Sequence, residues 1–121
     1  MSFDVYLEID TGAEEHTSVF WVNYTSNMDY AIRHSGIDMW AKSDDSMMTG
    51  DGLYILHGAS AEHAIEPLEA CIFQIVRDAP MLREREPKNG WGHVDTLLRD
   101  FLRPILEACK KHPKTTIRVS C

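Results

Sequence analysis

The sequence lacks the features that mark exported, membrane-spanning and disulfide-stabilised proteins. Its three cysteines are widely spaced and include no CxxC pair, so we expect reduced thiols. No apolar run approaches the roughly 20 residues that a membrane helix needs. No charged-then-apolar segment opens the chain, which argues against a signal peptide. We therefore expect a cytoplasmic protein without a membrane partner.

Positive charge is also scarce. Lys and Arg total 12 residues and Asp and Glu total 19, which gives a formal net charge of −7. Broad binding to phosphate backbones needs a basic surface, so this balance argues against sequence-independent nucleic-acid binding. One small anion held in a local pocket stays compatible with it.

The motifs of common enzymes and metal sites are missing too. The six histidines show no HxH or HExxH spacing, and the chain has no GxSxG elbow, P-loop or dinucleotide glycine fingerprint. We accordingly expect no metal, no cofactor and no set of catalytic residues. For the less favoured alternative of a small hydrolase, the acid–base candidates are Asp29, His93 and Asp95.

The residues that are present fit a single domain over 1–121, because a chain of this length buries a usable core without disulfides or metals. Apolar and polar residues alternate from Phe3 to Asp10, which predicts a half-buried strand. The β-favouring residues from Thr17 to Tyr24 predict a second strand. Alternation from Thr115 to Val119 predicts a third.

All three expected helices lie between the second and the third of these strands. A short helix is capped by Ser26 or Asn27. Ser60 caps a long helix that reaches about Arg77, and Pro67 either lies in its first turn or kinks it. The apolar stripe of this long helix consists of Ala64, Ile65, Leu68, Cys71, Ile72, Ile75 and Val76.

The third expected helix is the most regular one, from about Gly92 to Lys111, and Pro104 should bend it. The region 37–56 has a weak pattern, in which Leu53 to Leu56 is either a short strand or a buried turn. Its methionine-rich apolar residues belong either to the core or to a protein-binding surface; they are Met39, Trp40, Met47 and Met48.

This order of elements predicts a two-layer α+β domain: a small, mostly antiparallel three-stranded sheet packed by two long amphipathic helices and one short helix. The last strand can pair with the first in either direction. We favour the antiparallel pairing, which is two- to three-fold commoner. It makes the last strand parallel to the second, so the start of the last helix lies at the end of the second strand.

Two polar segments would then meet at one end of the sheet: Asn23–Asn27 after the second strand, and Asn89–Gly92 before the last helix. Backbone N–H groups at helix starts attract anions and carbonyls, and Trp91 offers a flat face for a ring. Arg83, Arg85 and Lys88 would supply positive charge nearby. The expected ligand-binding residues are Asn23, Thr25, Asn27, Tyr30, Asn89, Gly90, Trp91, Gly92 and His93.

A purely structural interpretation competes with this site. Asn and Ser before a helix are usually caps, and an Asn-Gly pair is usually a turn. Trp91 would then fold back on the last helix as a hydrophobic staple.

The strand from Phe3 to Gly12, the two polar segments and the segment His112–Val119 resemble a group of small proteins from actinobacterial phages and their hosts, for which no activity is settled. The resemblance covers both ends and most of the second half, and it is poor from about Ile37 to Leu56. It implies a phage-type accessory protein in the host cytoplasm that serves host takeover or counter-defence.

Two functions are therefore weighed ahead of the hydrolase. The first is non-catalytic binding of a small polar or anionic ring-bearing ligand, such as a nucleotide-derived signal. The alternative is a protein-interaction module that inhibits a host factor through the methionine-rich region. The oligomeric state stays open.

Overall fold

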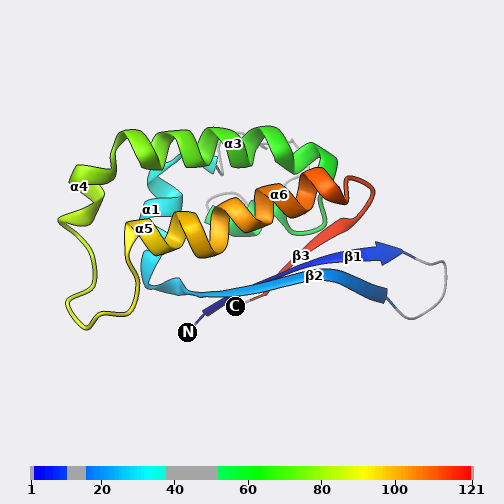
Figure 1. Cartoon of the computed structure of the whole chain (residues 1–121), viewed down its shortest axis with the longest axis horizontal. Coiled ribbons are helices and arrows are strands. Elements are labelled where there is room, and N and C mark those ends of the chain that lie inside the picture. Colours follow the sequence, from blue (N-terminus) through cyan, green and yellow to red (C-terminus); the bar gives the residue numbers. More distant parts are fainter. Residues whose placement is uncertain (1, 11–15, 38–51, 121) are drawn as a thin grey trace.

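A three-stranded antiparallel sheet forms one layer of the protein. The computed structural model describes residues 2–10, 16–37 and 52–120. Strand β1 (Ser2–Asp10) is central, with β2 (His16–Thr25) on one side and β3 (Thr116–Ser120) on the other. Both neighbours pair with β1 antiparallel, and helices cover one face of the sheet (Figure 1). The predicted α+β class and the predicted pairing of the last strand are both confirmed.

Alternation along the strands decides which side chains enter the core. Phe3, Val5 and Leu7 of β1 are buried, as are Ile117 and Val119 of β3. Because successive side chains of a strand point to opposite faces, the residues between them lie on the face that the helices leave open. The register between β1 and β2 shifts after Leu7.

The helical layer contains two long helical stretches that lie alongside one another (Figure 1). The first is α3 (Ala61–Arg77), which is followed by the short α4 (Ala79–Arg83). The second runs through α5 (Val94–Thr96), the π-helical segment η3 (Leu97–Leu102) and α6 (Arg103–Lys111). The short η1 (Ser26–Met28) and α1 (Asp29–His34) follow β2 directly.

The first long helix agrees with the sequence in its boundaries and differs in two details. The Ser60 hydroxyl accepts a hydrogen bond from the backbone N–H of His63, which is the predicted cap. Pro67 lies inside the helix and not in its first turn. Val76 is exposed, because it sits at the edge of the apolar stripe on the solvent side. At the short helix, the cap is Thr25 and not Ser26 or Asn27.

The last helix begins later and is less regular than its spacing predicts. Gly92 has φ +115° and His93 is extended, so helical geometry starts at Val94 and not at Gly92. The N–H of Arg103 bonds to the carbonyl of Leu98, five residues back. A proline has no N–H, and its ring collides with the preceding helical turn. Pro104 therefore disturbs the helix by widening the turn before it into a π-helical turn.

Leu53 to Leu56 belong to a buried 3₁₀ turn, η2 (Gly52–Leu56), and not to a strand. This settles the choice that the sequence left open. The four residues of the predicted protein-binding surface, Met39, Trp40, Met47 and Met48, lie outside the described residues.

The core fills the space between the two layers. Phe101 of η3 is fully buried and stacks with Phe3 and Tyr24 of the sheet, at ring-centroid distances of 6.4 and 5.5 Å. Cys71 and Cys109 are buried in the same core. Burial raises the pKa of each thiol to about 11, so both are protonated at neutral pH.

Candidate functional site

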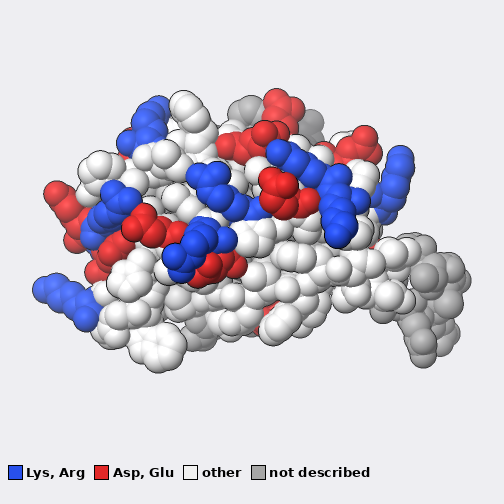
Figure 2. All heavy atoms as spheres, in the orientation of Figure 1, with Lys and Arg blue, Asp and Glu red and all other residues white. Residues whose placement is uncertain are grey.

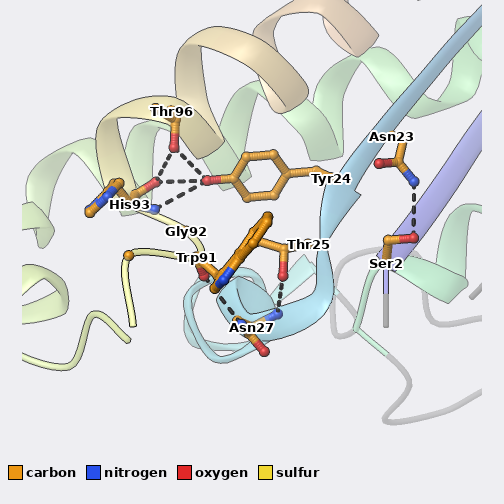
Figure 3. A pocket seen from close by; sticks show the side chains of 10 residues that line it. Ser2, Asn23, Tyr24, Thr25, Asn27, Trp91, Gly92, His93 and Thr96 are labelled. Atoms are coloured by element: carbon orange, nitrogen blue, oxygen red, sulfur yellow. Dashed lines mark hydrogen bonds between the residues drawn. The ribbon is translucent and has the colours of Figure 1, made fainter. Parts of the chain in front are cut away.

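The two polar segments lie together at one end of the sheet, as the topology predicts. Between them is a pocket of about 640 Å³, which lies within the usual range for small-molecule sites. Its walls come from the end of β2, from η1 and from the loop that leads into α5 (Figure 3). The described residues that line it are Ser2, Asn23, Tyr24, Thr25, Asn27, Gly90, Trp91, Gly92, His93 and Thr96.

The Tyr24 hydroxyl joins β2 to the start of α5. It accepts a hydrogen bond from the backbone N–H of His93 at 3.2 Å, and it lies 3.1 Å from the His93 carbonyl. The Thr96 hydroxyl is 2.5 Å from the Tyr24 oxygen and also donates to the His93 carbonyl. Two residues that are 69 positions apart in the chain are therefore held in direct contact at the pocket wall.

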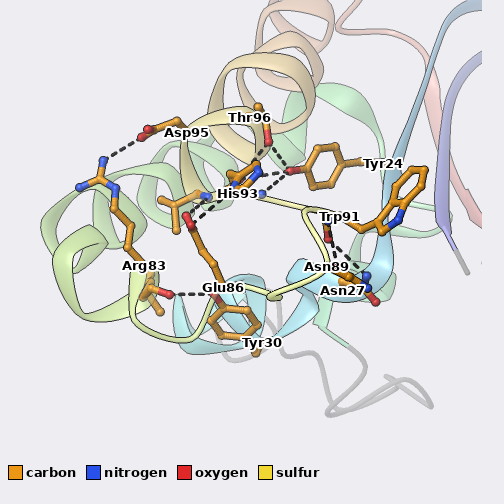
Figure 4. Close-up of polar contacts among 12 residues, drawn as sticks. Tyr24, Asn27, Tyr30, Arg83, Glu86, Asn89, Trp91, His93, Asp95 and Thr96 are labelled. Atoms are coloured by element: carbon orange, nitrogen blue, oxygen red, sulfur yellow. Dashed lines mark hydrogen bonds and ion pairs between the residues drawn. The ribbon is translucent and has the colours of Figure 1, made fainter.

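Trp91 stands at the mouth of the pocket with 68% of its surface exposed. Its side chain lies between Tyr24 and Asn27 in both close views (Figures 3 and 4). The side-chain amide of Asn27 donates to the Trp91 backbone carbonyl at 3.2 Å. The backbone N–H of Trp91 donates to the side-chain oxygen of Asn89 at 3.0 Å. These bonds fix the backbone of Trp91 and leave its ring in solvent, so the staple interpretation is wrong.

The two glycines beside Trp91 play different parts. A Cβ on Gly92 would lie 2.8 Å from the Met28 side chain and 3.1 Å from that of Thr25. Gly92 therefore allows close contact with the protein's own η1 and β2. Gly90 has φ +80° and open space around it, and both glycines line the pocket.

Lys, Arg, Asp and Glu are absent from the described residues of the pocket wall. In the view of Figure 2, Lys, Arg, Asp and Glu gather over the helices, whereas the surface along β2 is mostly uncharged. Arg83 bonds to Asp95 at 2.7 Å, and Arg85 lies over the Tyr30 ring at 4.8 Å from its centroid. The positive charge of Arg83 and Arg85 is therefore directed elsewhere, and Lys88 is not among the described lining residues.

The start of α5 already holds a carboxylate of its own chain. Glu86 accepts the backbone N–H of Val94 at 2.8 Å, and its other oxygen lies 3.3 Å from the His93 ring (Figure 4). A negative group at a helix start is stabilised by the free N–H groups and the helix dipole. The position where an anionic ligand was expected to bind is thus occupied by Glu86.

Two of the nine predicted ligand-binding residues do not line the pocket. The Tyr30 hydroxyl donates to the Leu82 carbonyl at 2.7 Å, which ties α1 to α4. Burial, together with the charge of Glu86, raises the pKa of Tyr30. Asn89 is used in the turn before Trp91. The other seven lie on the pocket wall, where their binding of a ligand stays a prediction.

Sequence reasoning missed three lining residues: Ser2, Tyr24 and Thr96. Tyr24 lies inside the first polar segment, but its place between Asn23 and Thr25 gives no sign that its ring points to the core while its hydroxyl reaches α5. Thr96 lies one helical turn after His93, which is a usable signal once the start of α5 is known. Ser2 becomes detectable only from its pairing with Thr25.

Two of the acid–base candidates for a hydrolase are held in ion pairs with arginine. Asp29 pairs with Arg33 at 2.5 Å. Arg83 lowers the pKa of Asp95 through a hydrogen bond and its charge, so Asp95 stays ionised and is a poor proton donor. Within the described ranges, no three His, Cys, Asp or Glu side chains form a group that would hold a metal ion, and every helix is too short or too polar to cross a bilayer.

Comparisons with protein-family models, with curated proteins and with solved structures return no match for this chain. The resemblance to phage proteins therefore stays a prediction. The pocket geometry is the basis on which a function can be proposed.

Proposed function

We propose that this protein binds, without catalysis, a small uncharged ligand with a nitrogen-containing ring, of the nucleobase or nucleoside class. The observation that carries the proposal is the convergence of the exposed Trp91 ring and several amide and hydroxyl side chains around one pocket. A flat aromatic face and a few directional polar groups are the usual means by which a protein orients a heterocycle.

The hydrogen-bonding inventory supports a ligand that carries N–H or amino groups. The side-chain carbonyl oxygens of Asn23 and Asn27 have no partner within the described part of the chain, because the bonds of these two residues are made by their amide nitrogens. Both oxygens are acceptors. The His93 ring nitrogen Nε2 is also without a partner there, since Nδ1 faces Glu86.

The charge distribution supports an uncharged ligand over the anionic one that the sequence left open. No described lining residue is a lysine or an arginine, and the α5 start is capped by Glu86. A phosphate beside that carboxylate would meet like-charge repulsion, with no lysine or arginine on the pocket wall to offset it. Nucleosides should therefore bind better than their phosphates.

The test is a thermal-shift and titration screen with free nucleobases, nucleosides and nucleoside monophosphates. A ligand at one hundred times its Kd adds about 2.7 kcal/mol to the stability of the folded form, which raises Tm by several degrees. We expect shifts with amino-bearing bases and nucleosides, and smaller shifts with the monophosphates.

The matched variants are Trp91→Ala and Trp21→Ala, which remove exposed indoles at the pocket and on the open sheet face respectively. Stacking contributes about 1–3 kcal/mol per base, so Trp91→Ala should weaken binding by about 5- to 150-fold and Trp21→Ala should leave it unchanged. A screen without any shift, or binding that survives in Trp91→Ala, would overturn the proposal.

The alternative of a host-factor inhibitor that acts through Met39, Trp40, Met47 and Met48 has no described contact in its support, because these residues lie outside the described ranges. The phage-type role in host takeover or counter-defence is compatible with sequestration of a nucleoside-like signal, and it is proposed only on the resemblance of the sequence.

A further inference from the structure

The outer face of α3 carries a charge pattern that is complementary to itself. Its first half presents Glu62 and Glu66 to solvent, its middle Ala70 and Phe73, and its end Arg77. Phe73 is 64% exposed, which is unusual for a phenylalanine on a helix whose opposite face is fully buried. Figure 2 shows charges of both signs interspersed over the helical layer.

The spacing of these residues matches a second α3 that runs in the opposite direction. At 1.5 Å of rise per residue, Glu66 and Arg77 lie at equal distances on either side of the point between residues 71 and 72. A two-fold axis at that point places Glu66 of each copy opposite Arg77 of the other. The same axis places the Phe73 ring of each copy over the small Ala70 of the other.

Helical geometry keeps these residues on one face. Residues 66, 70, 73 and 77 are separated by four, three and four positions, the spacing of neighbours on one side of a helix. Arg77 already pairs with Asp78 through Nε and Nη2. Its second terminal nitrogen, Nη1, still has two N–H groups for a carboxylate of another molecule, because a guanidinium carries five donors.

We propose that two copies of this chain associate through antiparallel packing of their α3 helices, with Phe73 in contact with Ala70 and Glu66 paired with Arg77 across a two-fold axis. Such an isologous contact uses the same patch on both copies. Parallel packing is disfavoured, since it would place Glu66 beside Glu66. The face is narrow and rimmed by charge, so the dimer should be reversible and dependent on protein concentration.

The test is analytical ultracentrifugation of the full chain over a range of concentrations. Wild-type protein should show a monomer–dimer equilibrium. Glu66→Arg and Arg77→Glu each convert both intermolecular ion pairs into like-charge contacts, so each variant alone should dimerise about tenfold more weakly. An equimolar mixture of the two variants restores both pairs and should recover wild-type association.

Phe73→Ser tests the apolar contact and should abolish dimerisation. Trp21→Ser removes another exposed aromatic from the sheet face and should leave the dimer intact. Thermal melts of each variant at a concentration where the chain is monomeric verify that it folds. A monomeric wild type at every concentration, or a mixture of the two charge variants that associates no better than either one alone, would overturn the proposal.

Discussion

Removal of one hydroxyl, with Tyr24→Phe, should loosen the connection between β2 and α5. The ring is retained, so its stacking on Phe101 is preserved. The hydrogen bond from the His93 N–H and the bond that the tyrosine donates are both lost. The Thr96 hydroxyl can still donate to the His93 carbonyl, but the His93 N–H is left without its partner.

The size of this effect follows from the number and the setting of the lost bonds. A typical intramolecular hydrogen bond contributes about 0.5–1.5 kcal/mol net, and two are removed here. Tyr24 is half-buried and His93 is exposed, so water reaches part of the site and offsets part of the loss. We therefore expect the free energy of unfolding to fall by about 1–2 kcal/mol, with a decrease in Tm of roughly 3–8 °C.

Urea unfolding followed by circular dichroism measures this change, and Tyr6→Phe is the matched control. The Tyr6 hydroxyl makes no hydrogen bond to another described residue, and its ring lies 6.4 Å from that of Trp21 on the open face of the sheet. Tyr6→Phe should be close to neutral. Equal stability of the Tyr24→Phe and wild-type proteins would refute the idea that this hydroxyl holds the two pocket walls together.

Two further predictions concern the loop and the core. Gly92→Ala should destabilise the fold by about 1–3 kcal/mol, through collision and a strained φ. Gly90→Ala meets open space, so a urea titration should place it closer to wild type; the reverse order would contradict the assigned packing. Cys71 and Cys109 should resist a thiol reagent at neutral pH until the chain unfolds, since burial raises the pKa of each from 9.0 to about 11. The folded form binds the thiol protons more tightly, so this part of the stability is complete below pH 9 and is lost as pH rises toward 11. Rapid labelling of Cys71 or Cys109 in the native protein, assigned by peptide mapping to separate it from labelling of Cys121, would show that the core is open.

The two proposals use different parts of the molecule. The pocket is built from β2, η1 and the α5 loop, whereas the dimer uses α3. A variant of Phe73 should therefore change association and leave ligand binding unchanged, and a variant of Trp91 should do the opposite. The two proposals can fail independently.

Local sequence patterns determined the strands, the long helices and the buried cysteines, because alternation and helical spacing depend only on neighbouring residues. The sheet topology could also be predicted from the sequence. Antiparallel pairing of β3 with β1, which is the commoner arrangement, was enough to predict that the segments around Tyr24 and Trp91 meet. Where a residue's conformation is set by distant partners, the sequence was insufficient. The late start of α5 is one such case, because the backbone N–H of His93 donates to the distant Tyr24 hydroxyl.

The character of the pocket was decided by tertiary structure alone. Nothing near Glu86 in the sequence indicates that its carboxylate caps α5 at Val94 and so takes the place of an anionic ligand. Nor does the sequence show that Arg83 bonds to Asp95 and is absent from the described residues of the pocket wall. The physical reason is that a long side chain selects its partner among all groups within reach in the folded chain, and that set exists only after distant segments have packed.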